Sequence, residues 1–327
     1  MMSMRAVVLA GTCEASELKV STVPVPAVRS GWVLVKVKAF GLNHSEVILR
    51  SFEADAPYIK LPRIPGIECA GEIEDASDSS FFRGQKVIAL MGGMGRSFDG
   101  SYAEYALLPI NIVFPVDTDL DWPELAAIPE TYFTAYSALF DCLQLNGSDS
   151  LLIRGATSAA GMAALQLAKS VGCTVTASSR RSEMLPILLA QGADCTLWDD
   201  GTLADQARKV MPHGFTRVLE LVGPATLLES MSLLAFHGIV CNVGILGKQY
   251  TLGNFDPIKD IPNGVYLSSF YSNYPSTRTI NRIFAHIRAY SLKPKLAKVM
   301  EFGEIAKAHI LMEKNQANGK IVIVTGD

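Results

Sequence analysis

The sequence lacks the features that would indicate export, a membrane or a disulfide framework. No apolar run approaches the ~18 residues that a bilayer-spanning helix needs. The first apolar run, Ala6–Leu9, is far too short for the core of a signal peptide. The six cysteines form no Cys-x-x-Cys pair. We therefore expect free thiols, a reducing cytoplasmic compartment and no membrane association.

Charge of either sign is also scarce. Charged residues make up 19% of the chain, hydrophobic residues make up 49%, and the formal net charge is -3. No polyanion such as a nucleic acid is therefore expected as the main partner. The apolar content is enough for a large core, and 327 residues exceed the ~250–300 that one core usually serves, so two domains are expected.

The order of apolar runs and turns predicts how these domains are arranged. Up to residue 122, short apolar runs alternate with Pro, Gly and Asp/Ser turns, a pattern typical of a compact β-barrel. From 123 to 271, helical segments alternate with six strands, which predicts an α/β fold with a doubly wound parallel sheet. Residues 272–327 end in a strand, Lys320–Thr325, which we expect to return to the first domain. The six strands are Leu151–Arg154, Cys173–Ser178, Cys195–Trp198, Arg217–Val222, Ile239–Val243 and Val265–Phe270.

A turn of small residues joins the first of these strands to a helix. Residues 155–161 read Gly-Ala-Thr-Ser-Ala-Ala-Gly. Within them, Ala156-x-Ser158-x-x-Gly161 stands where a dinucleotide-binding turn has Gly-x-Gly-x-x-Gly. Small residues allow a pyrophosphate to approach the backbone, and the helix N-terminus offers free N–H groups. A tight strand–helix corner without a ligand is the alternative. The nucleotide contacts expected here are Ala156, Thr157, Ser158, Ala159, Ala160 and Gly161.

The end of the next strand predicts which dinucleotide binds. No carboxylate is present there to bind an adenosine 2′-hydroxyl; the chain reads Ser178-Ser179-Arg180-Arg181 instead. Guanidinium groups pair with phosphate in a bidentate fork, which favours NADPH over NADH. A solvated arginine pair at a helix start remains the alternative reading.

Two further turns follow the fourth and fifth strands of this domain. They contain Val222-Gly223 and Val243-Gly244. Ligands of open α/β sheets bind beyond the carboxyl ends of the strands, so both turns are candidates for contact with the ribose and nicotinamide. Simple turn glycines are the alternative.

Several stretches, in this order and spacing, resemble the medium-chain dehydrogenase/reductase superfamily over essentially the whole chain. The resemblance implies a GroES-like β-barrel catalytic domain, 1–122 with 272–327, interrupted by a Rossmann NADPH-binding domain, 123–271. The stretches are Gly41-Leu-Asn43-His-Ser-Glu46, Pro65-Gly-Ile-Glu-Cys-Ala-Gly71, Gly100-Ser-Tyr-Ala-Glu-Tyr105, Pro129-Glu-Thr-Tyr-Phe-Thr134, Gln166-Leu-Ala-Lys-Ser-Val-Gly172 and Ala317-Asn-Gly-Lys320.

The resemblance also bears on metal binding. Zinc members of the superfamily place their catalytic ligands at positions that correspond here to Asn43, Ile67 and about Glu130. Isoleucine cannot bind a metal, and a neutral carboxamide is a poor zinc ligand. We therefore expect no metal, and the chain resembles the zinc-independent quinone oxidoreductase branch.

Without zinc to stabilise an alkoxide, the expected acceptor is a quinone or an α,β-unsaturated carbonyl, which spreads the developing charge over a conjugated system. Four residues are candidates for holding the acceptor oxygen or supplying a proton: Asn43, His44, Ser45 and Tyr58. Thr134 resembles a residue that touches the nicotinamide. Phe270 and Lys320 complete the expected cofactor contacts.

Three alternatives to this assignment differ in chemistry. A short-chain dehydrogenase is disfavoured because no Tyr-x-x-x-Lys occurs and the nucleotide turn comes late in the chain. A 2-enoyl-thioester reductase of the same fold would need a well-placed tyrosine. A non-catalytic, crystallin-like NADPH-binding protein, structural or RNA-binding, would bind the cofactor without turnover. Strand 265–270 is expected at a sheet edge, where we expect a homodimer to form.

Overall fold

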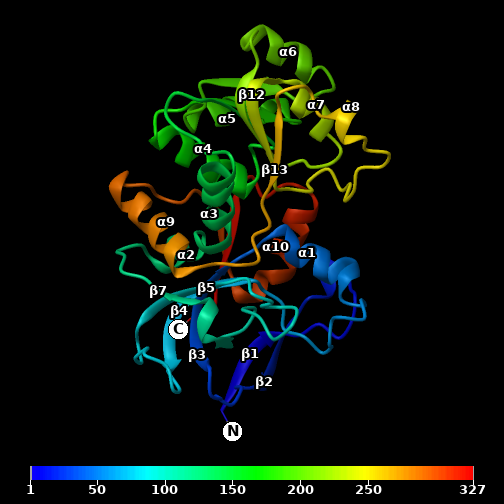
Figure 1. Cartoon of the computed structure of the whole chain (residues 1–327). Coiled ribbons are helices and arrows are strands. Elements are labelled where there is room, and N and C mark those ends of the chain that lie inside the picture. The colour runs from blue at the N-terminus through cyan, green and yellow to red at the C-terminus, as the bar shows by residue number, and fades with distance from the viewer. Residues whose placement is uncertain (1, 327) are drawn as a thin grey trace. The chain divides into compact units, whose positions relative to one another are not determined.

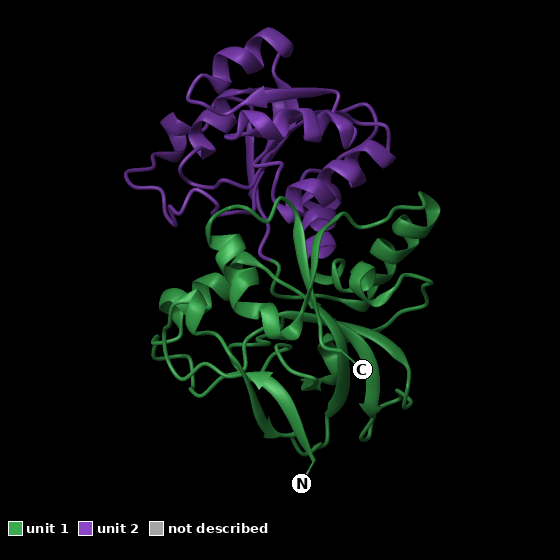
Figure 2. Cartoon of the chain, turned by 180° about the vertical axis from the view of Figure 1, so that it is seen from behind, with its two compact units in different colours: residues 1–130, 272–327 green, residues 131–271 purple. Residues whose placement is uncertain are grey.

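The computed structural model describes residues 2–326 and divides the chain into two compact units, coloured separately in Figure 2. The first unit runs up to Glu130 and resumes at Ser272; the second is Thr131–Tyr271. The chain therefore leaves the first unit once and returns to it. The helix that contains the first boundary is α3 (Pro129–Tyr136).

The first unit is built mainly of antiparallel strands (Figure 1). Its strands are β1 (Ser3–Val7), β2 (Val20–Pro24), β3 (Trp32–Gly41), β4 (Glu68–Asp75), β5 (Lys86–Leu90), β6 (Tyr105–Pro109), β7 (Val113–Pro115), β14 (Leu296–Glu301) and β15 (Lys320–Val324). One sheet has the order β14-β15-β3-β4-β5-β7, with β6 also paired to β3, and β1 pairs with β2. The closing strand β15 pairs antiparallel with β3 and so returns to the sheet of the first unit.

Helix α2 (Trp122–Ala126) packs against several strands of this sheet, and a cluster of aromatic rings lies in the core of the unit. Phe40 on β3 stacks on Tyr102, with ring centroids 4.6 Å apart, and meets Phe302 edge to face at 5.8 Å. The helices are α1 (His44–Ile48), α2 (Trp122–Ala126), α9 (Thr277–Ala289) and α10 (Ile305–Glu313), with shorter helical turns η1 (Ala15–Glu17), η2 (Leu49–Glu53), η3 (Ile110–Ile112) and η6 (Phe302–Glu304).

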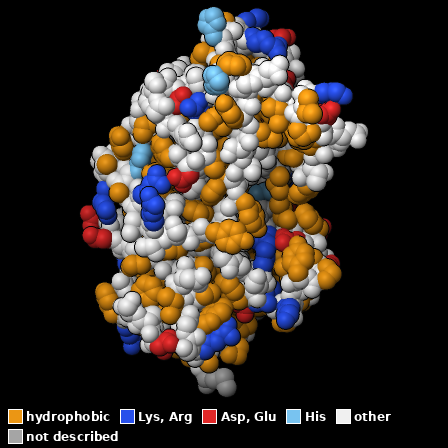
Figure 3. Space-filling view, in the orientation of Figure 1, with side chains coloured by type: hydrophobic (Ala, Val, Ile, Leu, Met, Phe, Trp, Pro, Cys, Tyr) orange, Lys and Arg blue, Asp and Glu red, His pale blue; other side chains and the backbone are white. Residues whose placement is uncertain are grey.

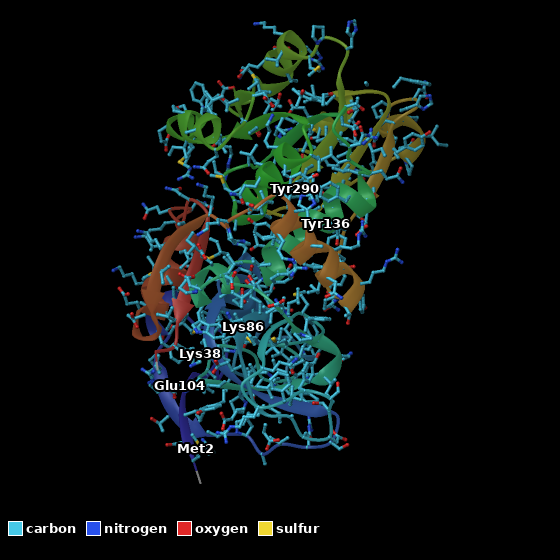
Figure 4. All side chains as sticks on the ribbon, turned by 90° about the vertical axis from the view of Figure 1, so that its left-hand side faces the viewer. Met2, Lys38, Lys86, Glu104, Tyr136 and Tyr290 are labelled. Carbon is cyan, nitrogen blue, oxygen red and sulfur yellow. The ribbon has the colours of Figure 1, made fainter. Side chains whose placement is uncertain are left out.

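Charged side chains of this unit pair with neighbours of opposite sign at its surface. Lys38 on β3 lies 3.7 Å from Glu72, and Glu104 lies 2.8 Å from Arg5; Figure 4 labels Lys38 and Glu104. On the face shown in Figure 3, basic and acidic side chains are interspersed among apolar ones. Both observations fit a chain of low net charge.

The second unit contains a six-stranded parallel sheet with helices between its strands (Figure 1). Its strands are β8 (Ser150–Arg154), β9 (Thr174–Ser179), β10 (Cys195–Trp198), β11 (Phe215–Glu220), β12 (Leu234–Asn242) and β13 (Tyr266–Ser269). Their order is β10-β9-β8-β11-β12-β13, which is the 3-2-1-4-5-6 order of the Rossmann fold. The predicted fold class is confirmed.

Central strands of this sheet are apolar because both of their faces are covered. Leu151, Leu152 and Ile153 of β8 are all buried. Since all six strands run parallel, their carboxyl ends share one edge of the sheet. The helices of this unit are α4 (Ala159–Ser170), α5 (Leu185–Ala190), α6 (Leu203–Val210), α7 (Leu227–Ser232) and α8 (Pro257–Asp260), with turns η4 (Ser137–Cys142) and η5 (Ser182–Met184).

Within residues 2–326, no helix is long and apolar enough to cross a bilayer.

Candidate functional site

The turn between β8 and α4 is shaped by two glycines and a helix cap. Gly155 adopts a φ of +83°, which favours glycine. Ser158 is the N-cap of α4, and its Oγ accepts a hydrogen bond from the Gly161 backbone N–H at 3.1 Å. A Cβ at Gly161 would lie 2.7 Å from the Cα of Ala156, so this glycine lets helix and turn pack closely. Thr157, Ala159 and Ala160, at the start of the helix, are only partly buried.

The end of β9 lies beside this turn. The Ala156 backbone N–H donates to the Ser178 carbonyl at 3.1 Å. The Ser178 side chain is fully buried, and its Oγ has no hydrogen-bond partner within residues 2–326. Such an orphaned polar atom fits a site that a polar ligand completes.

Beyond the serines, the two arginines differ in exposure. The Ser179 Oγ accepts a hydrogen bond from the Arg181 backbone N–H at 3.1 Å, which shapes the turn. Arg180 is exposed, and its carbonyl accepts a hydrogen bond from the Trp198 indole. In the part of the chain that the structure describes, the Arg180 guanidinium forms no ion pair. It is therefore available to an anion near the end of β9.

A buried carboxylate holds the turn after β11. The Oε1 of Glu220 accepts hydrogen bonds from the backbone N–H groups of Val222, at 2.7 Å, and Gly223, at 3.0 Å. The other oxygen accepts the Ser230 hydroxyl. Burial raises the pKa of Glu220 above its usual value. Glu220 was not among the residues predicted from the sequence. It could have been found, because it is an acidic residue that ends an apolar strand just before a glycine turn.

The glycines of the β11 and β12 turns pack against each other. A Cβ at Gly223 would lie 2.4 Å from the Gly244 carbonyl oxygen, and a Cβ at Gly244 would lie 2.0 Å from the Leu221 carbonyl oxygen. Val243 donates its backbone N–H to the Glu220 carbonyl at 2.9 Å. The close packing of the two turns explains why both positions are glycine, because a Cβ at either would clash with backbone atoms. This explanation does not require a ligand.

Thr134 lies near Phe270 in the second unit, because its chain neighbour Phe133 contacts Phe270. Thr134 lies on α3 and is 9% exposed. Its chain neighbour Phe133 meets Phe270 edge to face, with centroids 5.5 Å apart. The Phe270 backbone N–H donates to the Asn242 carbonyl at the end of β12.

In the first unit, a separate polar cluster forms around Asn43. The Lys320 Nζ donates to the Asn43 Oδ1 at 2.8 Å, and the Asn43 Nδ2 donates to the Glu68 Oε1 at 2.8 Å. Lys320 and Glu68 also form an ion pair, and both are almost completely buried. Asn43 is partly exposed. Its carboxamide is thus fixed at both ends, and one Nδ2–H remains to donate.

Glu46 is a second buried carboxylate of this cluster. Its Oε2 accepts the Asn43 backbone N–H at 2.9 Å, and its Oε1 accepts that of Ile67 at 3.1 Å. Burial, and next the negative charge of Glu68, raise the pKa of Glu46 to about 7. Two carboxylates therefore share one ammonium group, that of Lys320, in a desolvated space.

The remaining catalytic candidates lie close to this cluster along the chain but are more exposed. His44 and Ser45 open helix α1 and are partly exposed. The Ser45 carbonyl accepts a hydrogen bond from Arg96, whose guanidinium also pairs with Glu53. Tyr58 is 67% exposed, and its hydroxyl donates to Glu53 at 3.1 Å. Glu53 and Arg96 thus link the Tyr58 hydroxyl to the Ser45 carbonyl.

Two of the three positions that correspond to zinc ligands, Asn43 and Glu130, hydrogen-bond Glu68. Besides Asn43, the Glu130 backbone N–H donates to Glu68, at 2.7 Å, and the Ile67 N–H bonds the neighbouring Glu46. Ile67 offers no donor atom, and among the described residues no group of three or more His, Cys, Asp or Glu is placed to hold a metal ion. These residues do not fit a catalytic zinc.

Lys320 lies against Asn43 and Glu68 in the first unit. Its predicted contact with the cofactor stays a prediction. Glu46 and Glu68 were quoted for the family resemblance but not proposed as part of the site. Glu68 could have been found from the sequence, because it is an acidic residue that follows a Pro-Gly turn at the start of an apolar segment, Pro65-Gly-Ile-Glu68.

Comparison with known proteins gives the same family for both units. Residues 29–118 match the alcohol dehydrogenase GroES-like domain, and residues 191–323 match the zinc-binding dehydrogenase family. Human quinone oxidoreductase is 32% identical over 231 residues, which cover 69% of this chain and 68% of the relative. The chain belongs to the medium-chain dehydrogenase/reductase superfamily, in its quinone oxidoreductase-like branch. It is accordingly an oxidoreductase of the medium-chain type.

Solved structures agree in fold over the full length. An NAD-dependent alcohol dehydrogenase superposes with a TM-score of 0.88 at 26% identity, covering 99% of this chain and 100% of the other. A mycobacterial protein in complex with NADPH superposes with a TM-score of 0.85 at 21% identity, covering 98% and 100%. The predicted family is confirmed.

Proposed function

We propose that this chain is a cytoplasmic, zinc-independent, NADPH-dependent oxidoreductase that reduces a quinone or an α,β-unsaturated carbonyl. The observation that carries the proposal is the fixed carboxamide of Asn43, held by Lys320 on one side and Glu68 on the other. One remaining N–H can donate to an acceptor oxygen. A single neutral donor suits an oxygen whose developing charge is delocalised over a conjugated system. The cytoplasmic location is supported by six free thiols.

The second unit would hold the dinucleotide at the carboxyl ends of its strands. The turn at Gly155 and the N-terminus of α4 fit a pyrophosphate, the Ser178 hydroxyl offers an unused polar atom, and Arg180 offers a cation to a 2′-phosphate. Val222, Gly223, Val243 and Gly244 would line the ribose and nicotinamide. When bound, NADPH supplies the hydride.

The chain's own residues would orient the acceptor and supply the proton. Asn43 would fix the acceptor oxygen, and His44, Ser45 or solvent would supply the proton that follows the hydride. Tyr58 stays a weaker candidate, since its hydroxyl is bonded to Glu53. The placement of Lys320 supports a role in holding Asn43 instead of a direct contact with the cofactor.

An acceptor screen tests the reaction. We expect NADPH oxidation with naphthoquinone and with a simple enone. In metal-free buffer we expect no NADPH oxidation with acetone and no NADP+ reduction with ethanol. Asn43→Ala should lower kcat by about 10²-fold, the size expected for loss of one such donor. Turnover of simple alcohols with quinones untouched would overturn the proposal. Preferred turnover of crotonyl thioesters would indicate an enoyl-thioester reductase, and binding without turnover a crystallin-like protein.

A cofactor titration tests the nucleotide site separately. Arg180→Ala should weaken NADPH binding by about 10–100-fold, as loss of a charge-assisted contact predicts, and leave NADH binding unchanged. Arg208→Ala is a matched control, because Arg208 is an exposed arginine on α6 in the same unit. Tighter binding of NADH than NADPH by the unaltered protein would contradict the cofactor assignment.

The proposal includes a homodimer formed through β13. This strand is at the edge of the parallel sheet, and its side chains Tyr266 and Leu267 are 54% and 38% exposed. An exposed apolar edge is a ready surface for pairing with a second copy.

A further inference from the structure

Two thiols of the second unit are neighbours although they lie far apart in the sequence. Cys142 ends the turn η4, and Cys241 lies near the end of β12. Each thiol is the largest influence on the pKa of the other, and Ser268 on the adjacent strand β13 influences the pKa of both. Cys241 and Ser268 are register partners in the parallel pair β12–β13. The Cys142 Sγ in addition donates to the Ser269 carbonyl at 3.7 Å.

The two thiols are unequal in access. Cys142 is partly exposed, whereas Cys241 is fully buried. Hydrogen bonding from Cys241 lowers the pKa of Cys142 to about 7, and the same contact raises the pKa of Cys241. A reachable thiol with thiolate character beside a buried thiol is the arrangement in which the first reacts with an oxidant and the second resolves the product.

The other cysteines lack this arrangement. Burial raises the pKa of the Cys13 thiol, and no second thiol contributes to that shift. Burial raises the pKa of the Cys69 thiol to about 12 and that of Cys173 to about 11, which makes both unreactive. Cys195 is partly exposed like Cys142, but its Sγ bonds only the Thr196 carbonyl.

We propose that Cys142 and Cys241 are a redox-active dithiol, in which a peroxide oxidises Cys142 and Cys241 then closes a disulfide. In the first step, the Cys142 sulfur attacks hydrogen peroxide, an S–O bond forms, the O–O bond breaks, and water leaves. In the second step, the Cys241 sulfur attacks that sulfenic sulfur, the S–S bond forms, the S–O bond breaks, and a second water leaves. The two thiols are oxidised by two electrons and one peroxide is reduced to two waters.

The site is independent of the proposed hydride transfer. Neither thiol belongs to the polar cluster of Asn43 or to the expected phosphate contacts. It would respond to peroxide whether or not the protein turns over quinones.

Mass spectrometry of the full-length protein tests the proposal directly. Native protein is treated with hydrogen peroxide, unfolded with N-ethylmaleimide present, and digested with trypsin without reductant. Trypsin releases residues 97–154 and 218–248, and each of these peptides contains one cysteine, Cys142 or Cys241. We expect the two peptides joined by a disulfide, two fewer maleimide labels per chain, and full reversal by dithiothreitol.

Variants separate the two roles. Cys241→Ser should leave Cys142 as a sulfenic acid that dimedone traps, Cys142→Ser should give no disulfide, and the matched control Cys195→Ser should behave as the unaltered protein. Oxidation of Cys142 directly to sulfinic acid, or a disulfide between other cysteines, would overturn the proposal. So would peroxide reaction at Cys142 no faster than at Cys195. The first measurement uses the unaltered chain and so does not depend on a variant that folds.

Discussion

At the scale of single residues, the polar cluster of the first unit depends on the absence of one side chain. A Cβ at Gly41 would lie 2.3 Å from the Lys320 Cε and 2.4 Å from the Glu68 Oε1. The strand β3 therefore admits the buried ion pair only because it ends in glycine.

Gly41→Ala should displace Lys320 and Glu68 and release Asn43. We expect a loss of about 1–3 kcal/mol of unfolding free energy, as overpacking usually costs, and a fall in kcat. Denaturant unfolding and steady-state kinetics measure the two effects. Gly303→Ala is the control, because a Cβ there meets no atom within 4 Å. Equal behaviour of the two variants would show that Gly41 has no such role.

The raised pKa of Glu46 predicts a dependence of stability on pH. Because the folded-state pKa, about 7, exceeds the usual 4.5, the native protein binds more protons than the unfolded chain between these values. The contribution of Glu46 is therefore fully present below about pH 4.5 and is lost as pH rises through about 7. The shift corresponds to about 3 kcal/mol.

Denaturant unfolding at pH 5 and pH 8 measures this effect. At pH 5 we expect Glu46→Gln to have a lower unfolding free energy than the unaltered protein. Between pH 5 and pH 8, the variant should lose less unfolding free energy than the unaltered protein does. An unchanged slope would show that Glu46 does not titrate in this range.

At the scale of elements, the N-terminus of helix α4 contributes both to the stability of the fold and to the proposed cofactor site. Ser158→Ala removes the cap of this helix and should cost about 1 kcal/mol of unfolding free energy, together with weaker NADPH binding. Ser276→Ala removes the corresponding cap of α9, where the Ser276 Oγ accepts the Thr279 N–H at 3.2 Å. It should cost similar stability and leave NADPH binding unchanged. Fluorescence titration with NADPH separates the two caps.

Elements with strong local patterns were predicted from the sequence, and elements with weak ones were not. Strand β10 was predicted with its observed bounds, because it is a short apolar run between turns. The strand β14 was missed. Its sequence, Leu-Ala-Lys-Val-Met-Glu, has two charged residues and only one buried side chain, Met300, so its apolar pattern is faint. Pairing with β15 makes it a strand.

At the scale of the whole molecule, the proposed homodimer should be disrupted by a charged residue on its edge strand. Leu267→Lys puts a charge on the edge strand β13 and should convert a dimer into a monomer at micromolar concentration, measured by sedimentation velocity. Val299→Lys is the control, because Val299 is 48% exposed on β14, the edge strand of the other sheet. A monomer before any substitution would contradict the proposed dimer.

The sequence alone determined the fold class and the superfamily, because both depend on residues that are close in the chain. The nucleotide-binding role of the turn that follows β8 stays a prediction. The alternation of strands and helices can be recognised within short stretches of sequence. The same holds for the pattern of small residues from Gly155 to Gly161. Tertiary structure decided which distant polar groups meet. Asn43, Glu68 and Lys320 come from three separate segments, and only the pairing of β15 and β4 with β3 brings them together, with Glu68 and Lys320 buried.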